Sequence, residues 1–375
     1  MLEQEADRAA AAGDFVAARR LLEEALADGT AGYNQWMKLC AMRKAVGDLH
    51  GAVAAVDRAL ALSPLDFPAL LSRALMLEKL RPGTAGQDCG NALAQRPSEI
   101  SPAMQSAVQH AELQWRVHQE ALEANLSKHL PPTLSPLDRE QAERFISNRV
   151  RRTRHYHQEP SDFHYPGLPE LEFHDRRLFP ALAELEDEAE AIRSEFNALI
   201  AAEAAEIVPY IQYPERVPLR QWRELNFSRN WTAIHLLQNG LPLEANARHC
   251  PRTMAVLSSM PQPIVSGTSP NAMFSLLAPR TRIPAHTGVA NTRVVCHLPL
   301  IVPPGCGFRV GETVREWKVG EAFVFDDTIE HEAWNESDEL RVVLIIDLWP
   351  PALSAEAREV ISAVIGAYGV AFSGV

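Results

Sequence analysis

The chain has 375 residues, of which 46% are hydrophobic and 22% are charged, a composition typical of folded globular domains. Its length allows two or three domains, each with its own core. A formal net charge of −12 and a pI near 5.6 argue against binding to the phosphate backbone of nucleic acids. We therefore expect no nucleic-acid partner.

The first residues are acidic and lead directly into a helical pattern, without the charged and apolar regions of a signal peptide. No apolar run reaches the length of a membrane span. We therefore expect a cytoplasmic protein. The five cysteines are odd in number and lack CxxC spacing, so we expect neither a disulfide framework nor a zinc–cysteine site.

The first third of the chain repeats itself. The segment that begins at Gly13, with the apolar positions that follow it, aligns with the segment that begins at Gly47. This offset matches the period of the tetratricopeptide repeat, in which pairs of helices stack into an array. We predict about two and a half repeats and a capping helix from Ser101 to about Leu126. Together they form a TPR-like all-α domain over residues 1–128.

Two interpretations of these repeats stay open. Their concave surface could capture a peptide or protein, as helical repeat arrays commonly do. They could equally serve as a scaffold or dimerisation module that binds no substrate. The oligomeric state is open for the same reason.

The composition changes after the repeats. Residues 130–136 are rich in proline, which marks a hinge. A helix with six arginines between Arg139 and Arg154 follows, and it suits a solvated face or a contact between domains. We assign residues 129–160 to this linker and helix, and residues 161–375 to a second domain.

The second domain begins with helical sequence and continues with strands. An acidic amphipathic helix is predicted from Phe179 to about Glu206. Beyond Trp222, short runs rich in Val, Ile, Leu and Phe alternate with glycine and proline turns, which is typical of an all-β unit. The predicted fold class is therefore α+β and multidomain.

Two histidines, His286 and His331, each stand at one end of an apolar strand-like run. A small barrel presents metal ligands from neighbouring strands in this way, and neutral imidazoles suit a divalent transition metal. Fe(II) sites for oxygen chemistry usually add a carboxylate two residues after the first histidine, but here that residue is Gly288. Either water or substrate takes its place, or another acid does. The candidate acids are Asp326, Asp327 and Glu330.

Arg341 lies in an apolar strand near the C-terminus. An arginine that points inward from such a strand is costly unless it meets a carboxylate. It could bind the far carboxylate of a small dicarboxylic acid that chelates the metal. It could instead form a structural salt bridge, and the candidate partners are Asp326, Asp327 and Asp347.

This segment resembles the aspartyl/asparaginyl β-hydroxylase family of Fe(II)- and 2-oxoglutarate-dependent oxygenases. The family pattern combines an HTG..N.R motif, a second histidine motif, and FDD..EHE.WN with a downstream arginine. The matching residues are His286-Thr287-Gly288, Asn291, Arg293, His297-Leu298-Pro299-Leu300, Phe325-Asp326-Asp327, His331-Glu332, Trp334-Asn335 and Arg341. The resemblance covers residues 161–375 and leaves the repeats outside.

The resemblance implies a double-stranded β-helix of the jelly-roll or cupin type, in which His286 and His331 ligate Fe(II). It implies that 2-oxoglutarate is held by Ser275, His297 and Arg341, with the serine and the arginine on its distal carboxylate. Asp327 would accept a hydrogen bond and orient the iron-bound face of the site. The reaction implied is hydroxylation of a C–H bond. The expected target is the β-carbon of an Asp or Asn residue in a peptide or protein, which the repeats would recruit.

One position departs from the family pattern. Members that act on aspartyl side chains carry an arginine two residues before the second-motif histidine, and here this residue is Val295. Valine cannot pair with a substrate carboxylate, which leaves Arg293 as the candidate substrate anchor. The same chemistry on a lipid or small molecule is an alternative, although lipid-modifying relatives should carry membrane-anchoring helices. Non-catalytic alternatives are an interaction protein and a metal-free barrel with core histidines.

Overall fold

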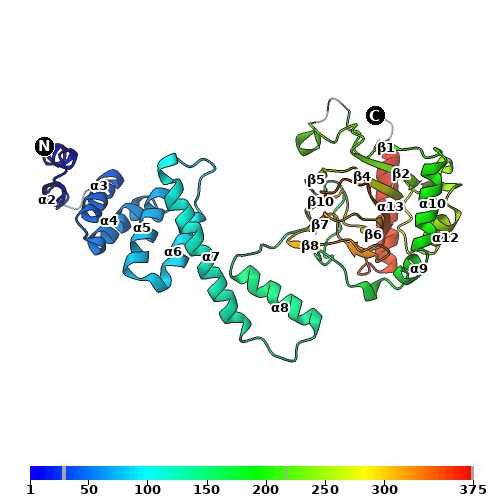
Figure 1. The fold of residues 1–375 in the computed structure, drawn as a ribbon, viewed down its shortest axis with the longest axis horizontal. Coiled ribbons are helices and arrows are strands. Elements are labelled where there is room, and N and C mark those ends of the chain that lie inside the picture. Colours follow the sequence, from blue (N-terminus) through cyan, green and yellow to red (C-terminus); the bar gives the residue numbers. More distant parts are fainter. Residues whose placement is uncertain (28–30, 215, 217, 373–375) are drawn as a thin grey trace. The chain divides into compact units, whose positions relative to one another are not determined.

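The structure, a computed structural model, describes residues 1–27, 31–214, 216 and 218–372. The chain divides into two compact units, Met1–Arg154 and His155–Val375, which Figure 1 colours from blue to green and from green to red. The predicted linker is shared between them. Its helix lies in the first unit, and its last six residues begin the second. The predicted boundaries at residues 128 and 160 lie on either side of this division and stay predictions.

The first unit is all-helical, as predicted. Its helices are α1 (Leu2–Ala11), α2 (Phe15–Ala25), α3 (Tyr33–Ala45), α4 (Leu49–Leu62), α5 (Phe67–Leu80), η1 (Pro82–Thr84), α6 (Ala85–Leu93), η2 (Pro102–Met104), α7 (Gln105–Ser127) and α8 (Pro136–Arg149). The offset between the starts of α2 and α4 equals the offset between the starts of α3 and α5, and both equal the offset between Gly13 and Gly47. The positions of the helices thus confirm the repeat that the sequence predicts. Helix α7 is the predicted capping helix, and α8 packs against it.

The turns inside the first two hairpins share one chemistry. Gly13 and Gly47 have φ angles of 81° and 83°, in the left-handed region that glycine adopts without steric cost. The aspartates that follow, Asp14 and Asp48, cap the next helix by accepting from the backbone N–H three residues on, at 2.9 and 2.8 Å. A Gly-Asp pair therefore both ends one helix and starts the next.

The second unit combines two sheets with surrounding helices. Its strands are β1 (Val208–Pro209), β2 (Trp231–Gln238), β3 (Leu241–Pro242), β4 (Ala272–Leu277), β5 (Thr281–His286), β6 (Val294–Ile301), β7 (Cys306–Val310), β8 (Thr313–Arg315), β9 (Phe323–Phe325), β10 (His331–Asn335) and β11 (Arg341–Leu348). Its helices are η3 (Arg176–Leu178), α9 (Leu182–Asp187), α10 (Ala189–Ala201), η4 (Arg220–Trp222), α11 (Glu244–Ala247), α12 (Pro251–Ser259) and α13 (Ala355–Phe372).

The order of the strands identifies the architecture. The larger sheet runs β1-β2-β4-β11-β6-β9, with β3 beside β2, and the smaller sheet runs β5-β10-β7-β8. All pairings between these strands are antiparallel. From β4 to β11 the chain crosses repeatedly between the two sheets, and the last strand, β11, pairs with the first of this series, β4. This topology is a jelly roll, which confirms the predicted double-stranded β-helix.

Both faces of the larger sheet are buried. On one face, apolar residues of β4, β6 and β11 pack against α9, α10 and α12, which lie together beside the sheet in Figure 1. On the other face, the alternate residues meet the smaller sheet in an aromatic-rich core. Because side chains alternate along a strand, this inner face also receives the polar residues Ser275, His297 and Arg341. The architecture therefore places the predicted site between the two sheets.

The predicted acidic helix is interrupted in the structure. It forms α9 and α10, which are separated by Glu188, and it ends at Ala201. The Glu188 carboxylate accepts hydrogen bonds from Arg252 of α12, which ties the break to a neighbouring helix. None of the helices over the described residues combines the length and apolarity needed to cross a bilayer.

Replacing Gly47 with alanine should destabilise the helical unit by about 1 kcal/mol, because alanine is disfavoured in the left-handed region. Gly83→Ala is the matched control, since that glycine has no positive φ and an added Cβ would meet nothing within 4 Å. Urea unfolding of the full chain, followed by helical circular dichroism, measures both. Equal stability of the two variants would contradict the prediction.

Candidate active site

His286 and His331 face each other across neighbouring strands. His286 ends β5 and His331 begins β10, and the two residues are paired in the register of the smaller sheet. Their ring centroids lie 4.0 Å apart. The ring of Trp222 packs edge-on against His286 at 4.8 Å. The structure thus brings together the two residues that the sequence predicts as metal ligands, in a setting largely closed by aromatic rings.

Backbone carbonyls orient both imidazoles. Nδ1 of His286 lies 2.8 Å from the Pro284 carbonyl oxygen, and Nδ1 of His331 lies 3.1 Å from that of Ile329. A carbonyl can only accept, so each Nδ1 carries the proton and each Nε2 presents its lone pair. Burial lowers the pKa of His286 to about 3 and that of His331 to about 4. Both rings are therefore neutral near pH 7, the state in which imidazole binds metals.

Asp327 fills the place of the acid that the sequence lacks. A Cβ built at Gly288 would overlap the Asp327 carboxylate, so only glycine leaves room for it. The backbone N–H of Gly288 also donates to the Asp327 carbonyl at 2.6 Å. Oδ1 of Asp327 is buried and has no hydrogen-bond partner among the described residues. Of the three candidate acids, the structure thus brings Asp327 to Gly288, two residues after His286.

Arg293 lies between two carboxylates. One of its terminal nitrogens is 2.9 Å from Asp327, and Nε is 3.5 Å from Asp347 at the end of β11. The pKa of Arg293 is raised overall, because the two carboxylates raise it by more than burial lowers it. The other terminal nitrogen, Nη1, is buried without a partner in the described part of the chain. The role of Arg293 as a substrate anchor therefore rests on this one nitrogen and stays a prediction.

Arg341 is buried without a carboxylate partner among the described residues. Its exposed fraction is 2%, and Nε has no hydrogen-bond partner among them. One terminal nitrogen donates to the hydroxyl and the carbonyl of Ser275, both at 3.4 Å, and the guanidinium lies over Trp317 at 4.9 Å. Burial lowers the pKa of Arg341 to about 10. The salt bridge considered from the sequence does not form within the described residues, because Asp327 and Asp347 pair with Arg293 and Asp326 bonds elsewhere.

The third histidine, His297, lies on the same inner face. Its Nδ1 accepts from the indole N–H of Trp317 at 3.3 Å. Indole nitrogen can only donate, so the neutral His297 ring carries its proton on Nε2 and can donate from there. Burial, together with the Arg341 charge, holds the pKa of His297 well below its ordinary value. His297 is thus a neutral hydrogen-bond donor in the same core as Arg341.

Aromatic residues complete the site, and the sequence did not identify them as part of it. Trp231 donates to the Ser275 hydroxyl at 3.1 Å and stacks on Tyr210 at 3.8 Å. Burial raises the pKa of Tyr210 to about 12. Trp222 and Trp317 contact His286 and His297 as described above. The chain has seven tryptophans, and sequence alone does not show which of them converge here; the pairing of β2 with β4 places Trp231 beside Ser275, and the fold brings Trp222 and Trp317 to the histidines.

The donor set fits a divalent transition metal and a dicarboxylate. Two neutral imidazoles whose Nε2 atoms carry the lone pair, and a carboxylate with one oxygen unpartnered among the described residues, suit Fe(II). A buried guanidinium that lacks a carboxylate partner within the described chain, a serine hydroxyl and a histidine N–H suit an anionic oxygen ligand. The metal would be held by His286 and His331, and the anion by Ser275, His297 and Arg341.

Comparison with known proteins agrees with this chemistry. A family model described as aspartyl/asparaginyl beta-hydroxylase matches residues 186–351. The second unit belongs to the aspartyl/asparaginyl β-hydroxylase family. Members of this family are hydroxylases by name, and the matched residues include the three histidines and Arg341.

Two curated relatives show the range of the family. Ornithine lipid ester-linked acyl 2-hydroxylase from Rhizobium tropici is 34% identical over 197 residues, which are 52% of this chain and 66% of that protein. Human aspartate beta-hydroxylase domain-containing protein 2 is 33% identical over 206 residues, 54% of this chain and 53% of that protein. The chain thus spans between half and two thirds of the length of these two relatives. A 2OG-Fe(II) oxygenase family oxidoreductase from Burkholderia pseudomallei aligns with a TM-score of 0.25 at 12% identity, over 44% of this chain and 93% of that one.

Acid should destabilise the metal-free protein through the two buried histidines. Between their ordinary pKa of 6.5 and the folded values of about 3 and about 4, the unfolded chain binds protons that the folded chain does not. The free energy of unfolding therefore falls as the pH is lowered, by up to about 1.4 kcal/mol per pH unit for each histidine. Urea titrations from pH 7 to pH 5 measure this slope.

The control for this prediction is the double variant His286→Asn/His331→Asn, which keeps polar side chains but removes both titrations. Its slope should be shallower than that of the wild type, while carboxylates elsewhere contribute equally to both proteins. Identical slopes would show that these histidines do not stay neutral in the fold.

Proposed function

We propose that the second unit is an Fe(II)- and 2-oxoglutarate-dependent dioxygenase that hydroxylates a C–H bond. The observation that carries the proposal is the buried Arg341, which has no carboxylate partner among the described residues and lies on the face of the larger sheet that meets the smaller sheet, where His286 and His331 lie. Such a cation calls for an anionic ligand, and a chelating dicarboxylate would join it to the metal. Membership of a hydroxylase family supports the same reaction.

Each residue has a defined task in this proposal. His286 and His331 hold Fe(II) through Nε2, and Arg341 and Ser275 hold the distal carboxylate of 2-oxoglutarate. His297 donates from Nε2 to a second acceptor of the cosubstrate. Asp327 is fixed by Arg293, and its Oδ1, which has no partner among the described residues, would accept a hydrogen bond that orients the metal-binding face of the site. When bound, the metal and 2-oxoglutarate supply the oxidative chemistry that hydroxylates an unactivated C–H bond. The aromatic rings exclude water from the site.

The substrate proposed first is an Asp- or Asn-type residue in a peptide or protein, hydroxylated at the β-carbon. The family description and the relative with aspartate beta-hydroxylase in its name support this class. The helical unit offers a surface for recruiting such a polypeptide, as stacked helical hairpins commonly do. Arg293 would contact the substrate through its unpartnered nitrogen.

Hydroxylation of a lipid acyl chain is the second candidate. The relative at 34% identity has a name that specifies an acyl 2-hydroxylase. Val295 also favours an apolar substrate, because it is buried on the inner face of β6, where it belongs to the aromatic-rich core. An apolar side chain at this position offers contact area and no charge to an entering ligand.

Substitution of the proposed ligands should separate metal binding from cosubstrate binding. His331→Ala should abolish Fe(II) binding with the fold retained, because it removes a ligand. Arg341→Ala should keep Fe(II) binding but weaken 2-oxoglutarate binding about 10- to 150-fold, the loss expected for a charge-assisted pair of about 1.5–3 kcal/mol. Anaerobic titration with Fe(II) and then 2-oxoglutarate, followed by the visible charge-transfer band, measures both.

Arg282→Ala is the matched control, since that arginine is exposed on β5 and pairs with Glu332 at the surface. It should bind both ligands like the wild type. Retained stoichiometric Fe(II) in His331→Ala would overturn the ligand assignment. Unchanged 2-oxoglutarate affinity in Arg341→Ala would mean that the cosubstrate binds elsewhere.

Val295→Arg should shift substrate preference toward side chains with a carboxylate, because a new guanidinium would extend from the inner face of β6. Succinate release in the presence of an Asp-containing peptide or of ornithine-lipid micelles measures the preference. An increase of about tenfold or more for the peptide is expected from one charge-assisted pair. Val314→Arg is the control, since that valine is exposed on β8. If the wild type and Val295→Arg both preferred the lipid, the result would favour hydroxylation of a lipid acyl chain.

A further inference from the structure

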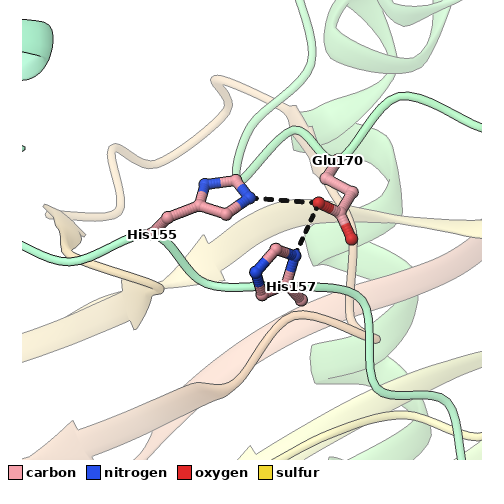
Figure 2. Close-up of side chains that lie close together, drawn as sticks. All are labelled: His155, His157 and Glu170. Atoms are coloured by element: carbon pink, nitrogen blue, oxygen red, sulfur yellow. Dashed lines mark hydrogen bonds and ion pairs between the residues drawn. The ribbon is translucent and has the colours of Figure 1, made fainter.

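A second group of ligand-type side chains lies on the segment that opens the second unit. Figure 2 shows the rings of His155 and His157 directed at one carboxylate oxygen of Glu170. Nε2 of His155 is 3.1 Å from this oxygen, and Nδ1 of His157 is 3.0 Å from it. The three ligand atoms all lie within 4.8 Å of one another. None of these residues belongs to the site between the sheets.

The spacing of these atoms is that of a metal coordination shell. Zinc binds imidazole nitrogen at about 2.0–2.1 Å and carboxylate oxygen at about 2.0–2.2 Å, so neighbouring ligands in a tetrahedral shell lie about 3.3 Å apart. The two nitrogen-to-oxygen separations differ from this value by only a few tenths of an ångström. The two rings meet edge to face, with centroids 4.3 Å apart, so both can direct a nitrogen at one point. Small side-chain rotations would therefore admit an ion.

The carboxylate is held from behind by the backbone. The other oxygen of Glu170 accepts from the backbone N–H of Gln158 at 3.0 Å, which leaves Oε2 for the histidines. A fixed outer partner of this kind raises the affinity of a metal ligand. The side chains of His155 and His157 are 56% and 67% exposed, and that of Glu170 is 32% exposed. An ion can thus enter from solvent and keep water in its fourth position.

The segment itself is anchored to the loops of the catalytic site. The Gln158 side chain accepts from Asn291 and donates to Asp326, the residue before Asp327. Two further backbone bonds join residues 161 and 162 to the carbonyls of Gly288 and Val289. The two histidines therefore lie on a segment with a defined place in the unit, residues 155–163, which we call the strap.

We propose that His155, His157 and Glu170 bind a divalent transition-metal ion, zinc in the first instance, at a site separate from the His286–His331 pair. Two imidazoles and one carboxylate are a ligand set that zinc accepts. The ion closes residues 155–170 into a loop and fixes Gln158 against Asp326. Its role is to hold the strap against the loop that follows His286 and the loop that carries Asp327. The chain then binds two equivalents of divalent metal.

The test is a zinc titration of the metal-free, tag-free full chain against a chromophoric chelator. The wild type should bind two equivalents. His155→Ala/His157→Ala should lose one equivalent and keep the other, and so should Glu170→Gln, which removes only the charge. His286→Ala/His331→Ala should lose the other equivalent and keep the strap site. His164→Ala is the matched control, an exposed histidine on the next stretch of chain, and should bind two.

Thermal unfolding gives a second readout. Zinc should raise the unfolding temperature of His286→Ala/His331→Ala, because an ion that binds only the folded state stabilises it. It should not do so when the strap histidines are also replaced. Unchanged stoichiometry in the strap variants, or no zinc-dependent shift in His286→Ala/His331→Ala, would overturn the proposal. Failure of the iron site leaves the strap site detectable, so the two proposals fail separately.

Discussion

A buried positive charge is the constraint around which the second unit is organised. Arg341 begins β11 opposite the buried Leu277 of β4, and the carboxylates that could have met it are used elsewhere. Taking a guanidinium out of water without a counter-charge costs free energy, which the surrounding core must offset. That core is large, since both faces of the sheet are covered. The fold thus tolerates a local instability that an anionic ligand would remove.

The polar residues near Arg341 differ in how their hydrogen-bonding and charged groups are paired. Arg293, just before β6, has two carboxylates, while Arg341 on the neighbouring β11 has none among the described residues. The ion pairs of Arg293 therefore position Asp327, whereas the charge of Arg341 is not balanced by a carboxylate of the described residues. His297 is kept neutral and oriented by Trp317. The two arginines thus differ in their ion pairs: Arg293 has two carboxylate partners and one unpartnered nitrogen, and Arg341 has no carboxylate partner among the described residues.

The helical repeats and the positions of three candidate site residues could be predicted from the sequence. The helical repeats could be predicted because Gly-Asp turns recur at a fixed offset and the aspartate of each turn caps the next helix. His286, His331 and Arg341 could be predicted as candidate site residues because a family motif coincides with a strand pattern at each of them. The pairing of Arg293 with Asp347 was not, since it depends on the register between β6 and β11, where Asp347 lies opposite Val295. Trp222, Trp231 and Tyr210 were not predicted as site residues because their contacts with the site depend on the tertiary fold. Trp231 reaches the site through the pairing of β2 with β4, while Trp222 lies on η4 and Tyr210 just after β1, and no local sequence pattern indicates their contacts.

The position of β11 in the larger sheet also has a consequence for synthesis of the chain. This strand, the last of those among the described residues, lies between β4 and β6, so the jelly roll cannot close until Leu348 has been made. The helical unit is already complete at Arg154. At ribosomal rates of about 5–20 residues per second, the delay between the two events is about 10–40 s. During it the helices can already fold while β4 and β6 lack their shared neighbour. The nascent chain therefore passes through a stage with an open sheet edge, whose unpaired backbone groups can pair with other chains.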